Sequence, residues 1–150
     1  MTVAIANDHA GVQLKRALAG YMEKRSITVK NLGTDSSEST DYPDYAREVA
    51  RAVQRKEADL GIVICGTGIG ASISANKFKG IHAALCYNVF TAKMARSHNN
   101  ANVMTIGART IQEEDAVCML DAFLGGVFAG DRHARRIEKI RTIEEESFKS

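Results

Sequence analysis

The feature that most constrains the fold of this chain is an alternation of short apolar segments with longer amphipathic ones. The clearest apolar segment, LGIVIC at 60–65, has no charged side chain and fits a central strand that is buried on both faces of a parallel sheet. Parallel neighbours need a crossover connection, which is usually a helix and is right-handed. Strand and helix alternate five times along the 150 residues. The pattern therefore predicts an α/β sandwich with a parallel sheet.

The spacing of the apolar residues sets the expected elements. Strands are predicted at 2–7, 27–32, 60–65, 81–86 and 102–107. Helices are predicted at about 10–25, 70–78, 88–97, 112–124 and 132–147. A further helix carries Tyr45, Val49 and Val53 and can be opened by Pro43, after a loop of turn-forming residues at 33–44. With no repeat, linker or composition break, residues 1–150 are expected to form a single domain.

Composition excludes several classes of partner. With 20 basic and 18 acidic residues the net charge is +2, too small a surplus to indicate a nucleic acid or an anionic membrane. The basic run at 132–136 has no aromatic platform with it, which argues against nucleic-acid binding. No apolar run is long enough to span a bilayer, and the N-terminus lacks the pattern of a signal peptide. We therefore expect a cytoplasmic protein.

The cysteine pattern indicates neither a disulfide framework nor a metal site. Cys65, Cys86 and Cys118 form an odd set, and the chain has no C-x-x-C pair. A zinc site or a dithiol redox site is therefore not expected. Of the three, only Cys65 stands beside residues with evident chemistry.

Polar residues follow two of the predicted strands at the point where each strand ends. Asn7, Asp8 and His9 follow the first strand, and the segment CGTG at 65–68 ends the third. In open parallel sheets ligands bind beyond the carboxyl ends of the strands. An acid and an imidazole at such an end can bind sugar hydroxyls or a phosphate. The simpler alternative is that Asp8 only caps the following helix.

Cys65 and the glycines after it form the pattern with the most chemistry. A cysteine that faces a helix N-terminus lies in a field that favours the thiolate, and glycines let backbone N–H groups converge into an anion nest. A thiolate beside an anion nest can attack a carbonyl carbon. It can also take a proton from a substrate while the nest binds the resulting oxyanion. A buried structural cysteine before a tight turn is the alternative. The spacing in GTGIG fits neither the dinucleotide fingerprint nor a phosphate loop with Gly-Lys-Ser/Thr.

Other polar residues have weaker local signals. His98 and Asn99 end the fourth predicted helix. Instead of binding a ligand, His98 could equally interact with the helix dipole, and Asn99 could cap the helix. Arg132 and Arg136 are four positions apart and share one helix face, so together they can bind a phosphate. The alternative is a solvated surface on which they pair with the glutamates that follow. Arg109 follows the fifth strand, on the same edge of the sheet as Cys65.

Segments spread over nearly the whole chain carry a resemblance to a known family. They are NDHAG at 7–11, GT at 33–34, DYPDYA at 41–46, GIVICGTGIGASISANKFKGIHAALC at 61–86, RSHNNANV at 96–103, IGART at 106–110 and RHARRIEKI at 132–140. Together they resemble the type B ribose-5-phosphate isomerases, a family that includes galactose-6-phosphate and allose-6-phosphate isomerases. One branch of that family has a glutamate just after the glycine loop and no cysteine. Here that position is Ala71 and Cys65 is present, so the chain resembles the cysteine-base branch.

The resemblance implies a fold and a reaction. The fold is a Rossmann-like three-layer α/β/α sandwich with a five-stranded parallel sheet and a C-terminal helix, working as a homodimer or tetramer with active sites shared between subunits. The reaction is the reversible conversion of D-ribose 5-phosphate to D-ribulose 5-phosphate, a step of the pentose phosphate pathway, without metal or other cofactor.

The resemblance also implies roles for individual residues. Cys65 moves the proton between C1 and C2, His98 helps to open the furanose ring, and Asp8 lies near the ring oxygens. Thr67 lies beside the O1/O2 edge. The backbone amides that hold the enediolate oxygens are those of Gly66, Thr67, Gly68, Ile69 and Gly70. The residues expected at the phosphate are His9, Arg109, Arg132 and Arg136.

Two further residues complete the expected site. Asn99 would bind a sugar hydroxyl, and Tyr42 would line the pocket. Because family members build each site from two subunits, His98, Asn99 and Arg109 are expected to serve the partner's Cys65. Cys86 and Cys118 match no catalytic position and are expected in the core.

Two alternatives remain open from the sequence. Within the family, the substrate could be allose 6-phosphate, galactose 6-phosphate or a tetrose phosphate. In another class, the chain could be a non-catalytic module that binds a sugar phosphate or a nucleotide. The combination of Cys65, Asp8 and His98 favours an enzyme, since a pure binder needs no base.

Overall fold

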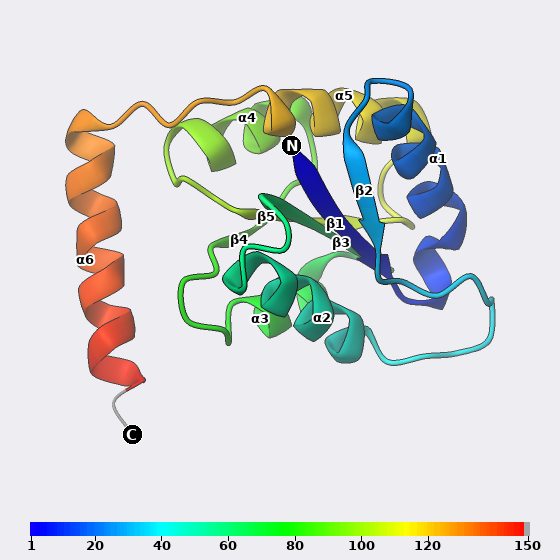
Figure 1. Ribbon diagram of the computed structural model, residues 1–150, viewed down its shortest axis with the longest axis horizontal. Helices are drawn as coiled ribbons and strands as arrows, with labels where there is room; N and C mark the ends of the chain where they lie inside the picture. The colour runs from blue at the N-terminus through cyan, green and yellow to red at the C-terminus, as the bar shows by residue number, and fades with distance from the viewer. Residues whose placement is uncertain (149–150) are drawn as a thin grey trace.

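The computed structural model describes residues 1–148 and shows a five-stranded parallel sheet between two layers of helices (Figure 1). The strands lie in the order β2-β1-β3-β5-β4, and every neighbouring pair is parallel. Their bounds are Thr2–Asn7 for β1, Thr28–Asn31 for β2, Leu60–Cys65 for β3, Ala83–Leu85 for β4 and Val103–Gly107 for β5. The predicted Rossmann-like α/β/α fold is confirmed.

The helices divide between the two faces of the sheet. One face, the upper one in Figure 1, is covered by α1 (Val12–Glu23), α4 (Val89–Ser97) and α5 (Glu113–Leu124). The other face is covered by α2 (Tyr42–Gln54) and α3 (Ile69–Ala75). Each layer buries its own apolar cluster against the sheet, so the two faces have separate cores.

The central strand β3 brings the functional edge together. All six of its residues are buried, as its uninterrupted apolar sequence predicts. It pairs with β1 on one side, with Asn7 opposite Ile64, and with β5 on the other, with Cys65 opposite Gly107. The chain after β1 stays in contact, because the Asp8 N–H donates to the Ile64 carbonyl at 3.1 Å. The segments that follow β1, β3 and β5 therefore share one edge of the sheet.

Some predicted elements are shorter in the structure. The helix expected from residue 10 begins with a separate 3₁₀ turn at His9–Gly11, which Asp8 caps, and ends at Glu23. The third helix ends at Ala75 rather than 78, and β4 covers only 83–85. The physical reason is a pair of side-chain bonds, both at 2.8 Å, in which the Asn76 amide donates to the Ala83 carbonyl and accepts from the Ala83 N–H. These bonds end the helix and tie it to the edge strand.

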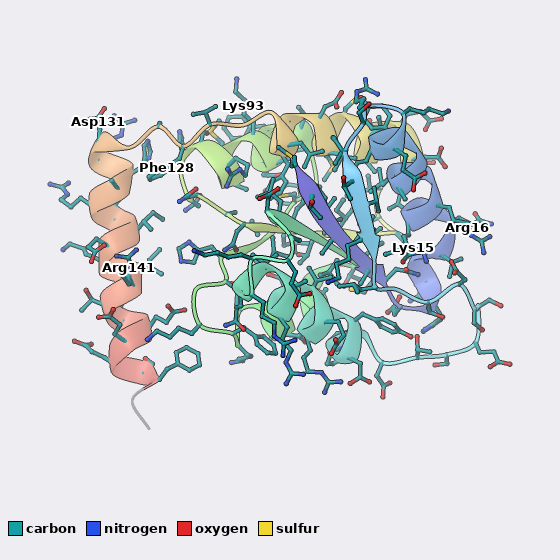
Figure 2. The ribbon with its side chains drawn as sticks, in the orientation of Figure 1. Lys15, Arg16, Lys93, Phe128, Asp131 and Arg141 are labelled. Atoms are coloured by element: carbon teal, nitrogen blue, oxygen red, sulfur yellow. The ribbon has the colours of Figure 1, made fainter. Side chains whose placement is uncertain are left out.

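The last helix, α6 (Asp131–Ser147), stands apart from the sheet and from both helical layers (Figures 1 and 2). The Ala129 N–H donates to the Ser97 carbonyl at 2.9 Å, and the Gly80 N–H donates to the Glu144 carboxylate at 2.7 Å. Much of the apolar side of α6 is open, with Ile143 61% exposed. No helix among residues 1–148 is long and apolar enough to cross a membrane.

Candidate active site

A cavity of about 510 Å³ lies at the carboxyl ends of β1 and β3, which is within the size range of small-molecule sites. Its lining includes nine residues that the sequence singles out, namely Asp8, His9, Tyr42, Cys65, Gly66, Thr67, Ile69, Gly70 and Arg109. Sequence reasoning missed three others, namely Ala10, Thr40 and Ile73. The edge of the sheet predicted to bind a ligand therefore carries a suitable hollow.

Cys65 lies at the floor of this cavity. The residue is 3% exposed, and its sulfur borders the hollow as the last side chain of β3. The Gly68 N–H donates to Cys65 Sγ at 3.1 Å. Gly68 has a φ of 79°, and a Cβ there would come within 2.6 Å of Leu85 Cδ1, so only glycine fits this turn. The turn thus aims a backbone donor at the sulfur.

The same turn offers further backbone donors to the cavity. The Ile69 N–H is held by Thr67 Oγ1 at 3.3 Å. Within residues 1–148, however, the N–H groups of Thr67 and Gly70 have no acceptor, as is usual where a helix begins. The first turn of α3 therefore presents free donors beside the cysteine sulfur, which is the arrangement of an anion nest.

Asp8 and His9 form the wall on the β1 side. Asp8 caps the 3₁₀ turn, since its Oδ1 accepts from the Ala10 N–H at 2.9 Å. It also lines the cavity, so the capping and the functional interpretations hold together. His9 Nδ1 accepts from the Thr40 N–H at 3.2 Å. A neutral imidazole that accepts at Nδ1 carries its hydrogen on Nε2, where it can be donated.

Arg109 and Tyr42 close the cavity from two other elements. The Arg109 N–H donates to the Gly66 carbonyl at 3.0 Å, and its guanidinium lies across Gly66, where a Cβ would be 2.9 Å from Nη1. The expectation that Arg109 serves the partner's Cys65 is therefore wrong for this chain, because β5 pairs with β3 and places Arg109 beside its own Cys65. Tyr42 opens α2 and packs its ring on Gly70.

The other predicted residues form a second group away from this cavity. His98 caps the C-terminal end of α4, and its ring stacks on His133 with centroids 4.1 Å apart and planes 12° apart. Arg132 and Arg136 lie on the same end of α6 as His133 and are exposed. Burial lowers the pKa of His133, and the neighbouring His98 and both arginines lower it further, which marks this group as a concentration of positive charge.

The topology explains why the two groups are apart in one chain. His98 precedes the amino end of β5, where the Asn102 carbonyl accepts from the Gly61 N–H at 2.8 Å. Gly61 and Cys65 are four positions apart in β3, so the two ends of the sheet differ by about 13 Å along the strand. In addition, α4 covers one face of the sheet and α3 the other. A single chain therefore cannot bring His98 to its own Cys65.

Asn99 lies in a different hollow, of about 460 Å³, between α6 and β4. This hollow is lined largely by apolar side chains, including Ile81, Ile140 and Ile143, and contains no nucleophilic thiol. It has the character of a contact surface rather than a reaction site.

Among the described residues, Arg132 and Arg136 form no ion pair with the glutamates that follow them in α6. Glu138 pairs with Arg141, and Glu144 accepts from the Gly80 N–H. Within residues 1–148, no carboxylate lies within 4.0 Å of Arg132 or Arg136. Both guanidinium groups are therefore available to an anion.

The remaining cysteines differ from Cys65 in their surroundings. Cys86 is fully buried, and burial raises the pKa of its thiol to about 12, so it is held as an inert core thiol. Cys118 is exposed on α5, so the expectation that it belongs to the core is wrong. It occupies the outward position between the buried Ala116 and Met119. Among residues 1–148 no cluster of three or more His, Cys, Asp or Glu side chains could hold a metal ion.

Comparison with known proteins gives consistent results. The family model for ribose and galactose isomerases matches residues 3–140. Ribose-5-phosphate isomerase B of Escherichia coli (strain K12) is 46% identical over 143 residues, covering 95% of this chain and 96% of that protein. The structure of Clostridium thermocellum ribose-5-phosphate isomerase B superposes with a TM-score of 0.96 at 46% identity, covering 98% of this chain and 99% of that one. Mycoplasma genitalium ribose-5-phosphate isomerase B with bound ribulose-5-phosphate superposes with a TM-score of 0.92 at 41% identity, covering 97% of each chain.

Fold, cavity and relatives together define an enzyme of the isomerase class on a Rossmann-like sheet. The chain belongs to the ribose/galactose isomerase family. The resemblance in the sequence motifs and the prediction of an isomerase are thereby confirmed.

Proposed function

We propose that this chain interconverts D-ribose 5-phosphate and D-ribulose 5-phosphate, with Cys65 as the base. The observation that carries the proposal is the bond from the Gly68 N–H to Cys65 Sγ at 3.1 Å, at the floor of a cavity lined by acid, imidazole and guanidinium groups. The backbone N–H of Gly68 holds the sulfur at the cavity floor, where it can reach a proton of a bound substrate. No metal or other cofactor is needed for this step.

The chemistry follows from the weak acidity of the sugar C–H bond. The Cys65 thiolate takes the proton from C2 of the open-chain aldose and leaves an enediolate, and it returns the proton to C1 while a hydroxyl proton moves from O2 to O1. The free N–H groups of Thr67 and Gly70 hold the negative oxygen. Each such donor is worth about 3 kcal/mol in the transition state, and the positioned base contributes about 10²–10⁴-fold.

The phosphate binds among the basic groups of the cavity. His9 and Arg109 line the cavity of the same chain and supply an Nε2–H and a guanidinium. In the homodimer proposed below, Arg132 and Arg136 of the partner chain supply two more guanidinium groups. Within residues 1–148 these groups have no carboxylate partner. A phosphate held this way orients C1 and C2 over the sulfur by binding energy remote from the reacting carbons.

The active site is completed by a second copy of the chain in a homodimer. Within one chain His98, Asn99 and the arginine pair lie away from Cys65, and two apolar surfaces are open. Ile69 and Ile73, at the mouth of the cavity, are 53% and 58% exposed. The hollow between α6 and β4 is apolar and includes Asn99. If α3 of one copy packs against that hollow in the other, each cavity gains Asn99 and His98 from its partner.

A panel of sugar phosphates tests the proposed reaction. The purified protein is incubated with the 5-phosphate of ribose, the 6-phosphates of allose and galactose, and a tetrose 4-phosphate, and ketose formation is followed. We expect the highest kcat/KM with ribose 5-phosphate. A higher value with a six-carbon or four-carbon substrate would move the assignment within the family, and binding without any ketose would indicate a non-catalytic module.

A further inference from the structure

The loop between β2 and α2 forms one wall of the cavity and has few ties to the rest of the molecule. It supplies Thr40 and leads directly into Tyr42, and both line the cavity. Between Gly33 and Asp41, the residues bonded to distant segments are Thr34, Asp35 and Thr40. The position of this wall therefore depends on a small number of contacts.

Two of these contacts come from a lysine that the reaction itself does not use. Lys15 of α1 is only 1% exposed, and its Nζ lies 2.9 Å from the Thr34 carbonyl and 2.7 Å from Asp35 Oδ1. Figure 2 shows Lys15 on α1 at the end near this loop, with Arg16 turned outward. The hydrogen bond from Lys15 holds the pKa of Asp35 below its usual value, as expected for a charged pair. A buried ammonium is costly unless it is paired, so Lys15 fixes where the loop can lie.

The start of the loop is also seated against β1. The Thr34 carbonyl accepts a second bond from Asn7 Nδ2 at 3.1 Å. A Cβ on Gly33 would come within 2.0 Å of Asn7 Oδ1, so the backbone touches the Asn7 side chain directly. The far end of the loop has one polar tie, the Thr40 N–H that donates to His9 Nδ1 at 3.2 Å. The loop thus connects the buried lysine to the imidazole in the cavity.

We propose that Lys15 is a positioning residue that, by holding Thr34 and Asp35, keeps the Thr40 N–H against His9 Nδ1. This contact fixes the ring orientation of His9 and the tautomer that offers Nε2–H to the substrate phosphate. The identity of that ligand rests on the proposed function, whereas the coupling between Lys15 and His9 does not.

The variant Lys15→Met tests the coupling with little risk to the fold. Methionine has a similar length and is apolar, the Asp35 carboxylate left behind is exposed, and the Thr34 carbonyl keeps its bond from Asn7. No buried polar group is therefore left without a partner. The control is Arg16→Met, one position along the same helix, because Arg16 is exposed and reaches Asp35 only at 3.9 Å.

Two measurements separate positioning from general stability. Nitrogen-15 NMR of the histidine side chains, assigned with His9→Gln, reports the tautomer of His9 directly. In Lys15→Met we expect the second tautomer of His9 to grow, and KM for ribose 5-phosphate to rise about tenfold with a smaller change in kcat. Arg16→Met should match the unaltered protein in both measurements.

The result that overturns the proposal is a Lys15→Met protein with the original His9 spectrum and the original KM. If Lys15→Met does not fold, Asp35→Ala breaks the same pair from its exposed end and should shift His9 in the same direction, and an unchanged spectrum would again reject the coupling. An unaltered protein that does not turn over ribose 5-phosphate would reject the proposed function alone, because the tautomer can still be read.

Discussion

The residues around Cys65 and those around His98 differ in how one chain holds them. In the first group, main-chain N–H groups donate to three of the side chains: Gly68 to Cys65, Ala10 to Asp8 and Thr40 to His9. In the second group the His98 and His133 rings stack on each other. Arg132 and Arg136 are exposed, with no carboxylate beside them among residues 1–148.

Under the proposed function, this difference separates what a single chain prepares from what a second copy supplies. Cys65, to which we assign the proton transfer, is held at the edge of the sheet where three strand ends meet. His98, Arg132 and Arg136, to which we assign ring opening and part of the phosphate binding, lie at the junction of α4 and α6. Such a division is what the proposed homodimer requires, and variants of either group test it.

The largest effect is expected from Cys65→Ala. Removing the base should lower kcat for ribose 5-phosphate by about 10²–10⁴-fold, while the fold and sugar-phosphate binding are retained, because the side chain only shortens at the cavity floor. The control is Cys118→Ala, since Cys118 is the exposed thiol on α5. Steady-state kinetics and isothermal titration measure the two quantities. A normal kcat in Cys65→Ala would remove this sulfur from the mechanism.

In the proposed homodimer, the two groups act across subunits, and a mixed dimer tests this. A mixed dimer is isolated by two tags, with Cys65→Ala on one chain and Arg132→Ala/Arg136→Ala on the other. If the sites are shared, one of its two sites has every residue intact, and the dimer should show about half of the unaltered activity.

The matched control places the three substitutions on one chain and pairs it with an unaltered chain. Shared sites then each lose one group, one the base and the other the arginines, and kcat/KM should fall far below half of the unaltered value. If instead each chain carries its own complete site, the two results exchange: the first dimer has a kcat/KM far below half of the unaltered value, and the second keeps half. Such an exchange of results would reject the proposal that each active site is divided between two copies of the chain.

A smaller effect is expected from His98→Asn, and it depends on the substrate. Ribose 5-phosphate must open its furanose ring, whereas a tetrose 4-phosphate cannot close one, because its O4 is blocked by phosphate. Asparagine keeps a polar cap at the end of α4 but cannot transfer a proton at the imidazole position. We expect kcat/KM to fall roughly tenfold more for ribose 5-phosphate than for the tetrose. Equal losses on both substrates would argue against ring opening by His98.

The part of the candidate site around Cys65 was accessible from the sequence because local patterns determine it. The apolar segment 60–65 places Cys65 at a strand end, and the glycines after it permit the left-handed turn at Gly68. Parallel strands put all their carboxyl ends at one edge, so Asp8 and Cys65 were expected together, whereas Arg109, on the same edge, was expected to serve the partner's Cys65 and instead lines the cavity of its own chain. Periodicity alone was therefore enough to predict both the sheet and its functional edge.

What the sequence did not reveal depends on contacts between distant segments. Thr40 is one of several turn formers in a loop, and only the folded chain shows that its N–H reaches His9. Lys15 did leave a signal, since it lies three positions before Leu18 and seven before Met22, on the buried stripe of α1. A lysine on an apolar stripe indicates a buried ion pair, but its partner in a loop twenty residues on cannot be read from spacing.

The smallest effect concerns the phosphate grip on α6. Arg136→Ala removes one guanidinium from the second group and should raise KM for ribose 5-phosphate about tenfold, because a charged hydrogen bond to the substrate is lost while the base is untouched. Arg135→Ala is the matched control: it removes the same charge one position earlier, on another side of the helix. If both variants raise KM equally, the effect is long-range attraction by the basic helix end rather than contact. Only a larger effect of Arg136→Ala supports a direct grip, and it should shrink little with added salt.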